Sequence, residues 1–405
     1  MPVSWLISIL LTLAVIGYFA GQARAMRSAG GDPRNLHSRP GYYGAHVALA
    51  GLLPALGLLV VWLILQPLVL EHARAATGNL IGTIAILGLM LLGCGLAYHR
   101  TRRDFRARNV IEAGIMALLI GAASIAILIT IGIVLSLVFN TVEFFHLYPA
   151  GDFFFGTTWS PSFGGGSQLA VLPLLWGTFY ISIIALGVAV PIGLFAAIYL
   201  SEYAGVRVRS VAKPMLEVLA GIPTIVYGLF ALLTVGPLLA RVFGDGGLGW
   251  MQAGMSVMTA GLVMGVMLIP FVSSLSDDIL NAVPQALRDG SYGLGATRSE
   301  TIRQVVLPAA LPGIAGAILL AASRAIGETM IVVLGAGAAA RLSLNPFDAM
   351  TTVTAKIVSQ LTGDADFASP EALVAFALGM TLFVITLALN IVALVIVRKY
   401  REQYE

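Results

Sequence analysis

Long apolar stretches separated by short polar segments make up most of this chain of 405 residues. Each stretch approaches or exceeds the ~20 residues that a helix needs to cross a bilayer. The pattern predicts nine membrane-spanning helices, at about 3–21, 46–70, 79–98, 110–139, 169–200, 212–240, 253–275, 308–338 and 372–397. The longer stretches are expected to tilt, to kink or to extend beyond the bilayer.

The composition agrees with this pattern. Hydrophobic residues make up 58% of the chain and charged residues 11%, whereas soluble domains carry roughly a quarter charged residues. We therefore expect an all-α integral membrane protein in contact with the lipid bilayer. The net charge of +3 is explained by cationic cytoplasmic loops and does not indicate nucleic acid as a partner.

Loop charge predicts the orientation. Eighteen of the Lys and Arg residues fall on one side of the predicted spans, four fall on the other side, and Arg324 alone lies within a span. Because cytoplasmic loops collect cations, the N-terminus is predicted outside and the C-terminus in the cytoplasm. The first apolar run has no preceding positive charge, so we interpret it as an uncleaved helix and not as a signal peptide.

The chain divides into two parts of different texture. Residues 1–109 are predicted to form a three-helix membrane extension without intramembrane charge. Residues 110–405 are predicted to form a six-helix core, in which prolines at membrane depth favour a transporter bundle over a simple anchor. Between two core helices, residues 140–168 are rich in aromatics, which we place at the membrane interface or in a short re-entrant turn.

The residues point to no catalytic, metal or cofactor site. The chain has no G-x-x-x-x-G-K-[ST] phosphate loop, so it is not expected to hydrolyse ATP by itself. Its five histidines are scattered, and its single cysteine, Cys94, lies in an apolar segment, which argues against a metal centre or a disulfide framework. We expect no enzyme activity in this chain and no bound cofactor.

The stretch Ser323–Met330, "SRAIGETM", places an arginine and a glutamate inside a predicted span. Each charge there costs at least ~2.5–3.5 kcal/mol on insertion scales. On a helix, Arg324 and Glu328 would share one face and would pair. The pair is either a structural salt bridge or part of a translocation path, in which the guanidinium binds an oxyanion and Glu328 orients it. Ser323 and Thr329 are possible secondary donors.

The cytoplasmic loop at about 276–307 has an unusual pattern. A helix-compatible segment, Gly295 and a second helix-compatible segment lead to Pro308, which suits the first turn of the next helix. Such a loop either inserts into a groove on a partner protein or lies as an amphipathic linker on the membrane surface.

The same loop resembles the "EAA" coupling motif of ABC importer permeases. The motif's E-A-A, glycine, isoleucine and L-P positions are filled here, with the motif's spacing, by Asp289, Gly290, Ser291, Gly295, Val305, Leu307 and Pro308. Together with residues 177–204, 216–232 and 323–330, the loop makes the region 110–405 similar to the PstC-type permease subunit of bacterial phosphate importers.

The resemblance implies a type I ABC importer permease bundle in the bacterial inner membrane. It further implies a homologous PstA-type permease partner, two cytoplasmic ATP-hydrolysing subunits docked on the 289–308 loop, and a periplasmic phosphate-binding protein. The expected function is passage of inorganic phosphate into the cytoplasm. The alternatives are a permease for another oxyanion, such as sulfate, molybdate or tungstate, and an ion-coupled secondary transporter or channel.

Overall fold

The computed structural model describes residues 3–69, 75–162, 166–244, 246–363 and 369–401. Within them, nine helices are long and apolar enough to cross a membrane, which confirms the all-α membrane class. They cover Val3–Ser28, Pro40–Leu63, Asn79–Arg100, Ala107–Leu147, Leu172–Tyr203, Thr224–Phe243, Val257–Ala282, Arg298–Ile326 and Pro370–Lys399.

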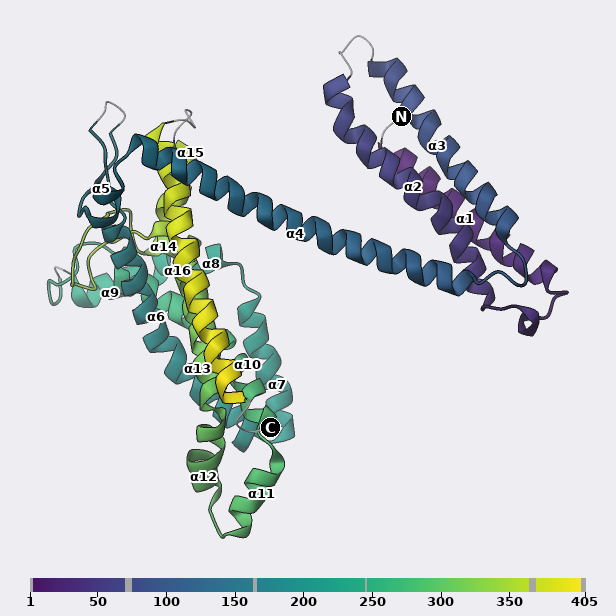
Figure 1. The fold of residues 1–405 in the computed structure, drawn as a ribbon. Coiled ribbons are helices and arrows are strands. Elements are labelled where there is room, and N and C mark those ends of the chain that lie inside the picture. Colours follow the sequence, from purple (N-terminus) through teal and green to yellow (C-terminus); the bar gives the residue numbers. More distant parts are fainter. Residues whose placement is uncertain (1–2, 70–74, 163–165, 245, 364–368, 402–405) are drawn as a thin grey trace. The chain divides into compact units, whose positions relative to one another are not determined.

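Contacts divide the chain into two compact units, residues 1–131 and 132–405. The division falls inside the long helix α4 (Ala107–Leu147), which Figure 1 shows as one continuous ribbon. The domain boundary predicted at 109/110 lies near the start of this helix and stays a prediction.

The first unit is a three-helix bundle of α1 (Val3–Ser28), α2 (Pro40–Val69) and α3 (Ala75–Arg100), joined to the start of α4. A short 3₁₀ turn, Pro33–Asn35, links α1 to α2. Glycines let these helices approach closely. A Cβ on Gly93 would lie 2.3 Å from the backbone oxygen of Ala50, so α2 and α3 touch backbone to backbone. Such small-residue contacts are typical of membrane helix packing.

The core of the second unit is the pair α6 (Leu172–Ile198) and α10 (Val257–Ala282). Gly261 and Gly265 of α10 face Ile184 and Val188 of α6, where an added Cβ would come within 2.6–2.7 Å of those side chains. This close packing makes α6 and α10 the rigid centre on which the other elements lie.

Two features near the start of the second unit differ from the expected interface loop. Helix α4 continues to Leu147, a short helix α5 (Ala150–Phe155) follows, and β1 (Trp159–Ser160) pairs antiparallel with β2 (Gln168–Leu169). Three of the aromatics predicted at the membrane interface, Phe144, Phe153 and Trp159, are instead buried in a core cluster of this unit. They pack there because Leu169, Leu174 and the start of α16 (Pro370–Arg401) offer a continuous apolar surface.

The span predicted at 212–240 is not one helix. The structure has α7 (Val206–Ala220), α8 (Thr224–Phe230), a π-helical turn (Ala231–Val235) and α9 (Gly236–Phe243). The break at Gly221–Pro223 has a local cause, because a proline disfavours helical backbone at the residue before it. The membrane-length segment therefore begins at Thr224, and α7 is a separate amphipathic helix.

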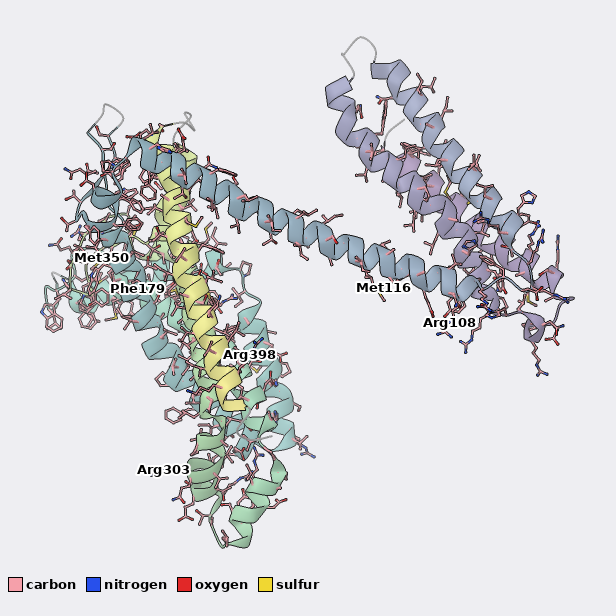
Figure 2. All side chains as sticks on the ribbon, viewed as in Figure 1. Arg108, Met116, Phe179, Arg303, Met350 and Arg398 are labelled. Atoms are coloured by element: carbon pink, nitrogen blue, oxygen red, sulfur yellow. The ribbon has the colours of Figure 1, made fainter. Side chains whose placement is uncertain are left out.

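The span predicted at 308–338 is also interrupted. Two short helices, α11 (Gln285–Gly293) and α12 (Arg298–Thr301), lead through a π-helical turn (Ile302–Val306) into α13 (Leu307–Ile326). After a break come α14 (Met330–Gly335), an irregular segment over 336–352 and α15 (Val353–Gly363). Within the second unit, Arg303 and Arg398 lie toward one end, and Phe179 and Met350 toward the other (Figure 2).

Candidate functional site

The loop at the cationic end of the second unit has the predicted form of helix, glycine turn and helix. Gly295 adopts φ +86°, a left-handed conformation that glycine takes at little cost. Its N–H donates to the carbonyl of Tyr292 at 2.9 Å, and Ala296 N–H donates to the carbonyl of Ser291 at 3.2 Å, which closes the turn after α11. The prediction of two short helices around a glycine is confirmed.

Local hydrogen bonds fix the second short helix. Thr297 and Glu300 form a capping box, in which the Thr297 hydroxyl accepts from the Glu300 N–H and the Glu300 carboxylate accepts from the Thr297 N–H at 2.8 Å. The hydroxyls of Ser291 and Thr301 are hydrogen-bonded at 2.9 Å and join α11 to α12. The hairpin of helices is therefore held together from within.

The other motif positions are spread along this hairpin. Asp289 accepts from the side-chain amide of Gln285 at 3.0 Å, and Gly290 lies in open space on α11. Val305 is in the π-helical turn, and Leu307 and Pro308 form the first turn of α13. At the tip, Leu294 is 91% exposed. The hairpin thus presents an exposed apolar tip away from the helix bundle.

The four predicted pathway residues lie where α13 ends. Ser323 and Arg324 are in its last turn, Gly327 is the helix C-cap, and Glu328 and Thr329 fall between α13 and α14. The Thr329 hydroxyl lies 3.5 Å from the carbonyl of Gly327. The charged stretch is therefore a helix break and not the middle of a membrane helix.

The predicted pairing of Arg324 with Glu328 is wrong. The helix ends before Glu328, so the two side chains do not share a helical face, and neither forms an ion pair within the described part of the chain. The Glu328 carboxylate accepts from the N–H of Met330 at 3.1 Å instead, at the start of α14. Its charge is placed at a helix N-terminus, where anions are favourable.

Arg324 has a different environment. Its side chain is exposed, and its guanidinium carbon lies 5.7 Å from the ring centroid of Phe271 on α10. A guanidinium over an aromatic face keeps its hydrogen-bond donors at the plane's edge free for bidentate binding of an oxyanion. The site therefore offers a cation without a carboxylate partner among the described residues.

Two neighbouring elements hold the break. Thr354, in the first turn of α15, donates its hydroxyl hydrogen to the backbone carbonyl of Glu328 at 2.7 Å. Gly228 of α8 approaches so closely that an added Cβ would lie 2.8 Å from the carbonyl oxygen of Met330. The break is consequently fixed by tertiary contacts on both sides.

Lys356, one of the four Lys and Arg residues on the external side of the predicted spans, lies near this region. It lies on α15, two residues after Thr354, and is half-buried with no hydrogen-bond or ion-pair partner among the described residues. Burial lowers the pKa of its ammonium below the ordinary value. The short length and polar flanks of α15 gave no signal that this lysine would be buried.

In the residues that the structure describes, no group of three or more His, Cys, Asp or Glu side chains could hold a metal ion. The donor that the break leaves exposed is the guanidinium of Arg324.

Comparison with known proteins adds the family. Residues 189–402 match the family described as binding-protein-dependent transport system inner membrane component, and residues 7–79 match one described as phosphate ATP-binding cassette transporter. A solved structure of a bacterial alginate ABC transporter overlaps with a TM-score of 0.49 at 16% identity, covering 71% of this chain and 94% of that chain.

Two curated relatives extend the match. The chain is 33% identical over 290 residues to the probable ABC transporter permease protein YqgH of Bacillus subtilis, covering 71% of this chain and 89% of the relative. It is 34% identical over 286 residues to the phosphate transport system permease protein PstC of Mesorhizobium japonicum, covering 67% and 86%. The chain therefore belongs to the family of binding-protein-dependent transport system inner membrane components, the permease subunits of ABC importers.

Proposed function

We propose that this chain is a membrane-spanning subunit of an ATP-driven phosphate importer. The observation that carries the proposal is the helix–Gly295–helix hairpin at the cationic end of the second unit, in a chain whose relatives include phosphate transport permeases. An ion-coupled secondary transporter has no need of such a hairpin. The match over residues 7–79 favours phosphate over other oxyanions.

The hairpin is proposed to receive an ATP-hydrolysing subunit. Its tip is apolar and exposed at Leu294, and its fold is maintained by its own hydrogen bonds at Thr297 and Ser291. An apolar helical tip of this kind fits a groove on a partner. Two such subunits are expected, one on this chain and one on a homologous permease partner of the PstA type.

The helix break at 327–329 is proposed to lie on the anion's path. Arg324 supplies a planar donor for a phosphate oxyanion, and no carboxylate of the described residues pairs with it. Cation–π contact with Phe271 keeps the guanidinium in place without satisfying its hydrogen bonds. The role of Glu328 is to stabilise the N-terminus of α14 by accepting from the N–H of Met330, and not to orient Arg324.

The orientation is proposed to place the hairpin in the cytoplasm. Arg303 and Arg398 mark that end of the second unit (Figure 2), and cytoplasmic ends collect cations. The opposite end, with Phe179 and Met350, would face the periplasmic binding protein that delivers phosphate.

The proposal is tested on the purified complex with its ATPase subunits in liposomes. Phosphate-loaded binding protein should stimulate ATP hydrolysis several-fold over the empty binding protein, because closure around the loaded protein drives the cycle. Stimulation by a sulfate-loaded or molybdate-loaded protein, with none by phosphate, would replace phosphate by that oxyanion.

A further inference from the structure

One buried arginine joins the hairpin to the membrane helices. Arg288, on α11, is 8% exposed. Its guanidinium donates to the Glu202 carboxylate at 3.0 Å, to the carbonyl of Val283 at 2.6 Å and to the carbonyl of Leu280 at 2.8 Å. Arg288 therefore connects α11, on which it lies, to the C-terminal end of α10 and to the segment after α6.

The three acceptors of Arg288 lie at helix ends. Glu202 is 6% exposed and lies in a π-helical turn, Tyr199–Tyr203, that continues α6. The Leu280 and Val283 carbonyls belong to the last turn and the C-cap of α10, where a cation is favourable. A movement of Arg288 thus acts on the two helices that form the rigid centre of the unit.

Two arginines of the hairpin reach those helix ends, Arg288 from a buried position and Arg298 from an exposed one, where its guanidinium carbon lies 5.3 Å from the centroid of the Tyr203 ring. Among the charged residues of 285–301, Arg288 is buried, whereas Asp289, Arg298 and Glu300 are exposed. A polar cavity of about 610 Å³ lies beside it, lined by Ser201, Glu202, Asn281, Gln285, Arg288, Tyr292 and Arg298. Arg288 consequently bridges a hollow between α11 and the ends of α6 and α10.

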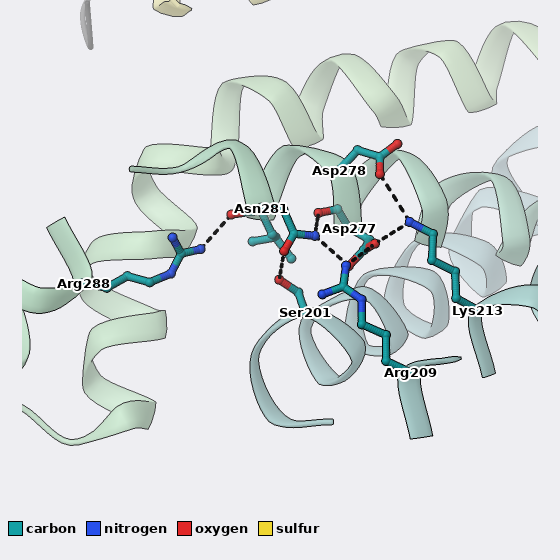
Figure 3. Close-up of polar contacts among 8 residues, drawn as sticks. Ser201, Arg209, Lys213, Asp277, Asp278, Asn281 and Arg288 are labelled. Carbon is teal, nitrogen blue, oxygen red and sulfur yellow. Dashed lines mark hydrogen bonds and ion pairs between the residues drawn. The ribbon is translucent and has the colours of Figure 1, made fainter. Parts of the chain in front are cut away.

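A second cluster continues from this point to α7 (Figure 3). The Asn281 side-chain amide donates to Asp277 at 3.0 Å, and its oxygen lies 3.4 Å from the Ser201 hydroxyl, next to Glu202. Asp277 is 2% exposed and accepts from Arg209 at 3.0 Å and Lys213 at 2.8 Å, both on α7. The hydrogen bond to Asp277 raises the pKa of the Lys213 ammonium, which keeps it charged. The two clusters meet at the end of α6, because Ser201 and Glu202 are neighbours in the sequence.

We propose that Arg288 is the positioning residue that carries displacement of the hairpin into α6 and α10, and from there through Asp277 into α7. This proposal rests on the proposed function, since it requires an ATPase on the hairpin. Because burying an ion pair has a desolvation cost, stabilisation of the fold alone is a weak explanation for the pair of Arg288 and Glu202. A rigid three-way contact across a cavity is, in contrast, what transmission of a push requires.

The test is the number of phosphate ions imported per ATP hydrolysed by the purified complex in liposomes. Arg288→Met, Arg288→Lys and Glu202→Gln are compared with Arg303→Gln, an exposed arginine in the π-helical turn that leads into α13. We expect the ratio to fall at least ~5-fold for Arg288→Met and Arg288→Lys, the lower end of ordinary coupling effects. ATP hydrolysis should persist, and Arg303→Gln should keep the unmodified ratio.

Glu202→Gln keeps the size of Glu202 and an acceptor oxygen, and Arg288 keeps its two backbone acceptors at the end of α10. This variant should therefore assemble even where Arg288→Met leaves the buried Glu202 carboxylate without its partner. We expect a lowered ratio for it too. The contrary result is that Glu202→Gln and Arg288→Lys give fewer assembled complexes, each with the normal number of phosphate ions imported per ATP. That result would show that the pair only stabilises the structure, and it would overturn the proposal. Absence of phosphate transport by the unmodified complex would instead contradict the proposed function. The failure of the proposal about Arg288 and the failure of the proposed function are therefore distinguishable.

Discussion

The hydroxyl of Thr354 donates a 2.7 Å hydrogen bond to the backbone carbonyl of Glu328, and so α15 holds the point where α13 gives way to α14. The break therefore has a fixed shape. Arg324, in the last turn of α13, is presented from it over the ring of Phe271. This relationship determines what exchanges at the two charged positions should do.

Arg324 and Glu328 should act independently. Arg324→Lys keeps the charge but loses the planar fork, and we expect uptake to fall about tenfold, the factor that ~1.4 kcal/mol of lost anion contact gives. Arg324→Gln should abolish uptake. Glu328→Gln keeps an oxygen that accepts from Met330 N–H, so most uptake should remain. The measurement is labelled phosphate uptake per inserted chain.

The double exchange Arg324→Gln with Glu328→Gln should behave like Arg324→Gln alone, because effects at residues without a shared contact add. Recovery of uptake in the double variant would mean that the two charges pair in the working transporter and that the guanidinium does not handle the anion.

Gly295 should be needed for its backbone conformation. An added side chain meets no atom within 4 Å, but φ is +86°, and left-handed backbone costs other residues roughly 1–2 kcal/mol. Gly295→Leu should reduce retention of the ATPase subunits on affinity-purified complex. Gly295→Asn should retain more of the ATPase subunits than Gly295→Leu, since asparagine tolerates the left-handed backbone conformation better than most residues. Gly293→Ala, in open space on α11, is the matched control.

Equal retention of ATPase in Gly295→Leu and Gly293→Ala would show that the turn's shape does not matter for docking.

Lys356 should give a pH-dependent contribution to stability. Because burial lowers the pKa of its ammonium from 10.5, the unfolded chain binds more protons than the folded chain between the lowered pKa and 10.5. The free energy of unfolding should therefore rise with pH through that window. Lys356→Met removes the cost of burying the charge, so it should raise thermal stability at neutral pH.

The advantage of Lys356→Met should shrink as the pH approaches 10.5, as measured by thermal unfolding of the purified protein in detergent. Exposed Lys399→Met is the control and should leave stability nearly unchanged. A stability gain of constant size at every pH would contradict the assignment of a buried charge.

The three N-terminal helices, α1 to α3, should be dispensable for the transport chemistry. A chain beginning at Arg102 keeps α4 whole and loses the bonds from the Tyr43 hydroxyl to the carbonyls of Arg103 and Phe105. We expect substantial phosphate uptake with lower abundance, measured per inserted chain. Complete loss of uptake in a normally inserted and assembled truncation would place residues 1–101 in the pathway.

The hairpin could be predicted from the sequence because its signals are local. Glycine at 295, proline at 308 and the spacing between them identify a turn and a helix start without any knowledge of distant residues. The apolar spans are local in the same sense, since about twenty apolar residues identify a span, but the spans predicted at 212–240 and 308–338 proved to be interrupted.

The helix break after Ile326 and the buried contacts of Arg288 could not be predicted in this way. A single glycine in an apolar run is compatible with a continuous helix, and the contacts that fix the break come from Thr354 and Gly228, distant in sequence. Arg288 resembled any other cytoplasmic loop cation, because its partner Glu202 is 86 residues away. Tertiary contacts decided both features.

Import of phosphate by this chain and its partners is tested most directly by uptake of labelled phosphate. The chain would be expressed with its permease, ATPase and binding-protein partners in a strain lacking its own phosphate system, and labelled phosphate, sulfate and molybdate would be supplied separately. We expect ATP-dependent uptake of phosphate, abolished by Arg324→Gln, and no uptake of the other two. Uptake of sulfate or molybdate in place of phosphate, with all partners present and inserted, would contradict the account.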